Sequence, residues 1–340
     1  MFDVKLFVTV LLSILMLIAM IVPGFLLRKL KMVSKISVRG LVTILLYVAS
    51  PFLIVKAFLY DGAKSPNPTD GGFLLSMLYV FIISIASLIL LFIVVKFCIR
   101  KMKPVEAARA YTYASVFGNI GFIGLPLTAA IFPDNPAALI YCAVFNVGFN
   151  ILIWTVGVYI FTGDIKAMRP LKIILNPTTV AFAVGLPLFL CKVDFNLSEA
   201  GRKVATFIGY IGDMTAPLSM LIVGIRLADM KLKEIFTDWR AWVCSAVRLL
   251  IAPAFMFGLV MLLRLTGMFG AGGTETYQNY GLVLIKVCIL LFALPVGATA
   301  IAFSEKFRGD TQSALNGFMN STLLSVATLP LVLGLLYSFL

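Results

Sequence analysis

The stretch that decides the fold is FGNIGFIGLP, residues 117–126. It lies in the middle of an apolar run, where three glycines and Pro126 weaken an α-helix and the proline removes a backbone donor. Inside a bilayer, freed backbone groups are tolerated only where protein or a water-filled cavity satisfies them. Taken alone, the stretch favours a kink with close glycine packing. A matching interruption elsewhere in the chain would favour a broken helix instead.

The composition of the chain is that of a membrane protein. Of its 340 residues, 61% are apolar and 13% are charged, whereas soluble domains carry about 25% charged residues. One membrane-spanning helix needs roughly 20 apolar residues, so ten spans with short loops would use most of the chain. We therefore expect an all-α membrane protein with spans at 6–27, 37–59, 73–98, 106–131, 137–161, 171–190, 203–226, 239–264, 279–304 and 311–338.

The net charge of +13 follows the ends of these spans. Most of the 28 Lys and Arg residues lie on one side, in stretches around 28–39, 96–109, 166–172, 226–240 and 306–308. The positive-inside rule makes this side cytoplasmic. We expect a multi-pass protein of the plasma (inner) membrane with both termini outside. Because the basic residues sit at span ends, nucleic acid is excluded as a partner.

Histidine and the common catalytic sequence motifs are absent from the chain. There is no histidine, which excludes His metal sites, Ser-His triads and His proton relays. The five cysteines lie in or beside apolar stretches without paired spacing, so they are expected to be packing thiols. No nucleotide-binding or nucleophile-elbow motif occurs. We predict no enzyme, no cofactor and no metal. A channel is less firmly excluded, although no acidic ring suggests one.

The two halves of the chain resemble each other. Similar segments recur 164 to 170 residues apart, and they centre on Pro23 and Pro187, Pro51 and Pro217, Pro126 and Pro295, and the Asn146/Asn150 and Asn316/Asn320 pairs. Each half holds five spans, an odd number, so the second must be inverted relative to the first. Inverted repeats are typical of secondary transporters. We predict a first repeat in residues 1–165 and a second in residues 166–340.

A second interruption, around Pro295 and Gly297, matches the first. Together the two favour crossed broken helices, here spans four and nine, with a binding site at mid-membrane. Helix ends there offer free N–H groups that suit a carboxylate, and Asn119 can donate or accept. The predicted substrate-binding residues are Ser50, Asn119, Gly121, Pro126, Asn146, Asn150, Thr215, Pro295, Asn316 and Asn320.

Each of these polar residues also has a structural interpretation. An asparagine inside a membrane can equally well form an interhelical hydrogen bond. The hydroxyls of Ser50 and Thr215 are more readily explained as partners of carbonyls that the following prolines leave free.

Three ionisable residues lie inside predicted spans: Asp213, Arg248 and Lys286. Such groups are costly in a bilayer and are usually paired or functional. A structural Asp213–Arg248 ion pair is the favoured interpretation. The alternatives are that Asp213 couples transport to a proton or cation, or that Arg248 or Lys286 attracts an anion. Neither the sequence near Asp213 nor its counterpart in the first repeat offers a second carboxylate, so a two-aspartate cation site is not supported.

Several of these segments resemble the auxin efflux carrier family of membrane transporters, within the bile-acid/sodium symporter-like superfamily. The resemblance covers nearly the whole chain and rests on residues 118–127, Asn176-Pro177, 217–224, 248–253 and 294–305. The family includes plant auxin exporters and bacterial carriers for malate, malonate and similar carboxylates. It implies a scaffold domain of helices 1, 2, 6 and 7 that often dimerises, and a transport domain of helices 3–5 and 8–10 whose broken helices 4 and 9 cross.

The resemblance also implies how substrate is held. In the plant carriers an asparagine seven residues before the span-four proline contacts the substrate carboxylate, and Asn119 occupies that place. We expect a homodimeric, bacterial-type secondary carrier of small organic anions, with elevator-like movement and H+ or Na+ as the candidate coupling ion. The alternatives are a cation- or proton-coupled antiporter of this fold that uses Asp213, and a non-transporting membrane sensor.

Overall fold

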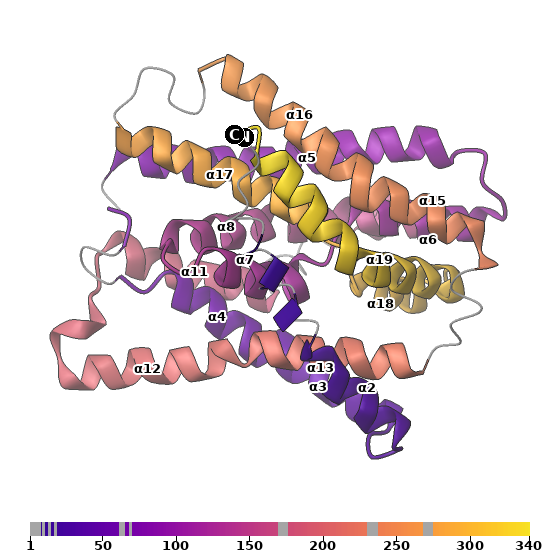
Figure 1. Ribbon diagram of the computed structural model, residues 1–340, viewed down its shortest axis with the longest axis horizontal. Coiled ribbons are helices and arrows are strands. Elements are labelled where there is room, and N and C mark those ends of the chain that lie inside the picture. The colour runs from indigo at the N-terminus through magenta and orange to yellow at the C-terminus, as the bar shows by residue number, and fades with distance from the viewer. Residues whose placement is uncertain are drawn as a thin grey trace.

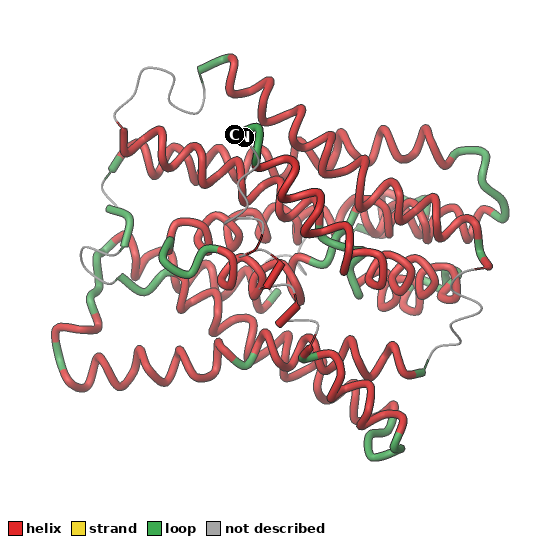
Figure 2. Tube along the Cα trace, in the orientation of Figure 1, coloured by secondary structure: helices red, strands yellow, loops and turns green. Residues whose placement is uncertain are grey.

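The computed structural model is helical throughout the part of the chain that it describes (Figures 1 and 2). It describes residues 8, 11–12, 15–16, 19–60, 65–67, 70–168, 176–229, 237–267 and 275–340. These residues form no β-strand, only two isolated bridges. Six of their helical stretches are long and apolar enough to cross a membrane, and Ile120–Ile131, Pro177–Leu190 and Asn279–Ala293 are shorter apolar helices. The expected all-α architecture is confirmed, whereas the ten-helix inverted repeat stays a prediction.

The helices follow the predicted spans, although part of the first span lies outside the described residues. In the first half they are α2 (Ile21–Lys29), α3 (Lys35–Ile44), η1 (Leu45–Ala49), α4 (Ser50–Ala57), α5 (Gly71–Ile99), α6 (Val105–Val116), η3 (Ile120–Gly124), α7 (Leu125–Ile131), α8 (Pro136–Leu152), η4 (Ile153–Gly157), α9 (Val158–Thr162) and η5 (Ile165–Ala167).

In the second half they are α11 (Pro177–Leu190), η6 (Phe195–Leu197), α12 (Glu199–Asp213), α13 (Thr215–Ala228), α15 (Trp239–Ala246), η7 (Val247–Ile251), α16 (Ala252–Leu265), α17 (Glu275–Ala293), α18 (Thr299–Lys306) and α19 (Thr311–Tyr337). Several helices begin where a polar side chain accepts a hydrogen bond from the first turn, as at Asp70, Asn176, Asp238 and Asp310. Such N-caps satisfy donors that a helix leaves unpaired.

The helices make their most extensive contacts in two groups. In one group α2 packs against α13, and α4 packs against α11 and α12. In the other, α5 contacts α6, α8 and α17, while α19 lies against α15 and α6. Figure 1 shows α2, α3, α12 and α13 along one edge of the molecule, with α15, α16 and α19 toward the opposite edge. The division into two moving domains stays a prediction.

The two interruptions meet backbone to backbone. After α6 the chain is extended at residues 117–119, and after α17 it is extended at residues 295–297. Gly118 and Val296 form an antiparallel bridge, in which the Asn119 N–H donates to the Pro295 carbonyl at 2.9 Å and the Gly297 N–H donates to the Phe117 carbonyl at 2.9 Å. The two broken helices therefore cross and satisfy each other's freed groups, as a bilayer requires.

Pro126 is not part of this crossing. It is buried inside the helical stretch Ile120–Ile131, where η3 passes into α7, and the break precedes it by several residues, whereas Pro295 lies within the second break. The two prolines thus occupy different places relative to the interruptions, which corrects the expected correspondence between them. Pro126 directly follows the π-helical turn η3, and local π-helical geometry is one way in which a membrane helix accommodates a proline. Pro126 therefore lies inside a helix and does not interrupt it.

The side chain of Arg248 stabilises the crossing through hydrogen bonds. Its side chain comes from η7 and is fully enclosed, with 1% of its surface exposed. The guanidinium donates from Nε to the Leu294 carbonyl at 2.8 Å, from Nη2 to the Leu291 carbonyl at 3.0 Å and from Nη1 to the Val116 carbonyl at 3.1 Å. These carbonyls are at or next to the C-terminal ends of α6 and α17, where helices leave acceptors unpaired and the dipole is negative. One side chain therefore caps two helices.

The expected Asp213–Arg248 ion pair is wrong. Lys56 Nζ donates to the two carboxylate oxygens of Asp213 at 2.7 and 2.8 Å, and the Asp213 side chain is 61% exposed. Arg248 needs no carboxylate partner, because main-chain carbonyls accept hydrogen bonds from its guanidinium. Lys286 lies elsewhere in the bundle, with its Nζ 5.9 Å from the centre of the Tyr337 ring.

We predict that Gly118→Ala destabilises the protein. A Cβ at this position would lie 2.1 Å from Arg248 Nη2, and the guanidinium cannot withdraw without losing hydrogen bonds that contribute about 1.5–3 kcal/mol each. Thermal unfolding of purified protein in detergent should occur several degrees lower than in the parent. The control is Gly258→Ala on α16, where an added Cβ meets nothing within 4 Å. Equal unfolding temperatures for the parent and Gly118→Ala would contradict this account of Arg248.

Candidate functional site

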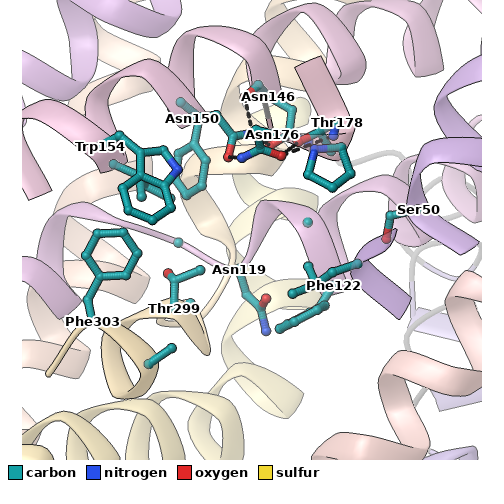
Figure 3. Close-up of a pocket in the computed structure, with 18 of the residues that line it drawn as sticks. Ser50, Asn119, Phe122, Asn146, Asn150, Trp154, Asn176, Thr178, Thr299 and Phe303 are labelled. Carbon is teal, nitrogen blue, oxygen red and sulfur yellow. Dashed lines mark hydrogen bonds between the residues drawn. The ribbon is translucent and has the colours of Figure 1, made fainter. Parts of the chain in front are cut away.

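A cavity of about 510 Å³ lies beside the crossing (Figure 3). Its wall comes from both halves of the chain: from η1 and α4, the first break and η3, α8 and η4, the start of α11, and the second break with α18. This volume falls within the range of about 300–1,000 Å³ that small-molecule sites occupy. The cavity lies where the predicted crossing leads one to expect a binding site.

Four polar residues on one wall of the cavity hold each other in place. Asn150 Nδ2 donates to the Asn146 carbonyl at 2.7 Å and to Asn146 Oδ1 at 3.1 Å, and Asn176 Nδ2 donates to Asn150 Oδ1 at 2.9 Å. The Asn176 side chain also caps α11 by accepting from the Thr178 N–H at 3.1 Å. Figure 3 shows this chain of amides above the crossing. It ties α8 to the first turn of α11.

Three donors in the cavity wall lack a partner. Asn119 Nδ2, Asn146 Nδ2 and Ser50 Oγ are buried and make no hydrogen bond to any of the described residues. The three residues are only 2–3% exposed. A buried donor without an acceptor costs about 1–3 kcal/mol, so these groups suit a ligand that brings acceptor oxygens. Their side chains come from α4, the first break and α8, on different sides of the cavity.

The charge in the wall of the cavity is positive. Among its lining residues only Lys306 carries a charge, and none is a carboxylate. The Lys306 Nζ lies 4.6 Å from the centre of the Trp154 ring, so a cation–π contact helps to position it. The break places Gly297 and Thr299 in the wall, where α18 begins and its dipole is positive. These features favour an anion over a cation.

Five of the predicted site residues line this cavity: Ser50, Asn119, Gly121, Asn146 and Asn150. The structure places the other five outside its wall. Pro126 lies where η3 passes into α7, Pro295 accepts the Asn119 N–H at the bridge, and Thr215 is fully buried in α13. Asn320 Oδ1 accepts from Ser245 Oγ at 2.7 Å, and Asn316 Oδ1 accepts from Gln312 Nε2 at 3.0 Å.

The physical reason is that α19 packs against α15, so its asparagines serve contacts within and between helices. The structural explanation of the two hydroxyls is also wrong. Neither Ser50 Oγ nor Thr215 Oγ1 has a hydrogen-bond partner among the described residues.

The sequence analysis missed Asn176, Thr178, Thr299, Trp154 and Lys306 as lining residues. A signal existed for Asn176, because an asparagine before a proline is typical of a helix start, and a cap at a mid-membrane helix end offers further polar atoms. Nothing in the sequence indicates that Asn176 reaches Asn150, 26 positions away. Lys306 was counted only among the cations that mark the membrane boundary.

Comparison with known proteins agrees with this architecture. The family described as "Membrane transport protein" matches residues 9–333, nearly the whole chain. The chain belongs to this family. The resemblance to auxin efflux carriers inferred from the sequence is thereby confirmed, and the family is one of membrane transport proteins and not of enzymes.

Three curated relatives have the same general character. A protein named "Uncharacterized transporter" from Methanothermobacter thermautotrophicus is 26% identical over 65% of this chain and 65% of its own length. An uncharacterized transporter from Methanocaldococcus jannaschii is 26% identical over 45% of this chain and 49% of its own length. A protein named "Putative malonate transporter" from Rhizobium meliloti is 24% identical over 87% of this chain and 85% of its own length. The match thus spans less than two thirds of the first two relatives.

We predict that two buried asparagines differ in their contribution to stability. Asn320→Ala leaves Ser245 without its acceptor and should lower the free energy of unfolding by about 1–3 kcal/mol. Asn119→Ala removes an amide whose Nδ2 has no partner among the described residues, so stability should change by less than about 0.5 kcal/mol. Thermal unfolding of both variants without ligand checks this. A larger loss in Asn119→Ala than in Asn320→Ala would mean that Asn119 is structural.

Proposed function

We propose that this transporter is a secondary carrier of small organic anions such as carboxylates. The observation that carries the proposal is the set of three buried, unpartnered donors on Ser50, Asn119 and Asn146 around one cavity. A carboxylate accepts several hydrogen bonds at once, and bonds to a charged acceptor are stronger than those between neutral groups. Such a ligand would accept hydrogen bonds from the three donors that have no partner among the described residues.

The charge of the cavity supports the same substrate class. Lys306 supplies a positive group, the α18 N-terminus adds a partial positive charge, and no lining carboxylate opposes an anion. The relative named "Putative malonate transporter" makes malonate the first substrate to test. A dicarboxylate could use the amide wall at one end and Lys306 at the other.

The position of the cavity supports an elevator mechanism. Leu46, Tyr47, Ser50 and the start of α11 belong to the predicted scaffold helices, while the remaining wall belongs to the predicted transport helices. We propose that the transport helices carry the anion past the scaffold. The proposed arrangement is two inverted five-helix repeats, residues 1–165 and 166–340, with crossed helices 4 and 9.

We propose further that the protein lies in the plasma (inner) membrane with both termini outside and dimerises through its scaffold. Exposed apolar residues on α12, among them Phe207 and Tyr210 at 56% and 74% exposed, offer a face for a second copy. The coupling ion is proposed only as H+ or Na+. The alternative antiporter mechanism, with Asp213 as coupling group, gains no support from the structure, because Asp213 is paired with Lys56 at an exposed position and does not line the cavity.

We predict that Asn119→Ala abolishes carboxylate uptake. A hydrogen bond to a charged ligand contributes about 1.5–3 kcal/mol, so its loss should weaken substrate binding roughly 10- to 150-fold. The measurement is uptake of radiolabelled malonate and a panel of other small carboxylates into proteoliposomes, with protein amount and unfolding temperature matched. Undiminished uptake by Asn119→Ala would overturn the assignment. Binding of a carboxylate by the parent without any flux would favour a membrane sensor.

A second prediction uses two hydroxyls that the sequence repeat treats as equivalent. Ser50 lines the cavity and Thr215 does not, although both are buried and lack a partner among the described residues. Ser50→Ala should lower uptake several-fold through a higher KM, while Thr215→Ala should leave KM unchanged. The KM for the best substrate in each variant, measured in the same proteoliposomes, checks this. Equal effects would indicate that the hydroxyls act through helix packing.

A further inference from the structure

A second cavity, of about 350 Å³, lies at the cation-rich end of α5, away from the crossing. Its wall is formed by the end of α5, the start of α6 and the residues around the end of α9. Every charged side chain in this wall is a cation: Lys96, Arg100 and Arg109. We propose that this cavity binds the phosphate headgroup of an anionic phospholipid.

The three cations have no carboxylate partner among the described residues. Lys96 Nζ lies 5.8 and 5.9 Å from the ring centres of Phe92 and Tyr159, and the Arg100 guanidinium lies 4.2 Å from that of Phe97. Like charges gathered around one cavity repel each other, and an anion between them removes that repulsion. The aromatic rings hold two of the cations in place without neutralising them.

Arg109 is fixed more firmly than its two neighbours. Its Nη1 donates to the Phe161 carbonyl at 3.0 Å near the end of α9. The chain then turns through Gly163, whose φ of +70° is readily adopted only by a residue without a side chain. A Cβ at Gly163 would lie 3.2 Å from Arg109 Nη2. The glycine turn therefore leaves room for the guanidinium, which sits partly buried in the wall.

The surroundings of the cavity favour a lipid over a free ion. Val105 lines it and is 58% exposed, and Ile93 and Phe97 on the same end of α5 are 58% and 65% exposed. In a membrane protein such side chains contact acyl chains, so a phosphate between the cations would continue into a hydrophobic tail beside α5. The distribution of Lys and Arg predicts that this end faces the cytoplasm, and anionic lipids of that leaflet attract basic residues near the membrane surface.

The test compares lipid retention by the full chain and two charge-matched variants. The first variant is Lys96→Gln/Arg100→Gln, which keeps the structural bond of Arg109. The control is Arg202→Gln/Lys203→Gln on α12, which removes two exposed cations far along the chain. Each protein is purified in detergent, titrated separately with phosphatidylglycerol, phosphatidylcholine and inorganic phosphate, and analysed by native mass spectrometry. Unfolding temperatures show that each variant is folded.

The parent and the control variant should retain phosphatidylglycerol, and the Lys96/Arg100 variant should bind it about 30-fold more weakly, which corresponds to about 2 kcal/mol for two cations. Phosphatidylcholine should bind weakly to all three proteins. Equal affinity of the parent and the Lys96/Arg100 variant for phosphatidylglycerol would overturn the proposal. Binding of inorganic phosphate as tightly as phosphatidylglycerol would also overturn it, because the site would then recognise a soluble anion.

Discussion

The hydrogen bonds from Arg248 to the ends of two helices are the contact on which the rest of this structure depends. Two interrupted helices leave unpaired carbonyls deep in the molecule, and in the core of a bilayer no water is available to donate hydrogen bonds to them. The guanidinium has five donors in a rigid fork, and three of its bonds reach α6 and the α17 segment at 2.8–3.1 Å. The antiparallel bridge between Gly118 and Val296 satisfies further backbone groups. Together these contacts make the crossing a stable element.

The crossing and the cavity divide the polar groups of the protein between two tasks. On the Arg248 side the main-chain carbonyls at the helix ends are paired with the guanidinium. The guanidinium leaves no room for a side chain at Gly118. On the cavity side, Asn119 and Asn146 keep amide donors without partners among the described residues, and an added Cβ at Gly121 would meet nothing within 4 Å. The paired groups of the crossing thus lie beside unpaired donors that face the cavity, an arrangement that would suit a pre-formed binding site.

The sequence was most informative where the physics is local. Apolar run lengths predict the spans, and the cluster of glycines before Pro126 indicates an interrupted helix. It was less informative about the exact place of the break, because Pro126 lies inside the helical stretch Ile120–Ile131, after the break and not within it. The partner of Asp213 could not be deduced either, since Lys56 is 157 positions away. The Asn150–Asn176 contact and the Lys306–Trp154 contact likewise depend on how distant segments pack.

The burial of Arg248 has an electrical consequence for a carrier. A guanidinium stays protonated in proteins, and moving one elementary charge through a membrane potential changes the energy by about 2.3 kcal/mol per 100 mV. If the crossing moves together with its bound ligand, the positive charge of Arg248 moves with it. Lys306 on α18, in the cavity wall, would move as well, so these two positive charges would be balanced by a doubly charged dicarboxylate, whereas the empty protein would return with both of them uncompensated. In such a cycle the membrane voltage would act mainly on the return of the unloaded carrier.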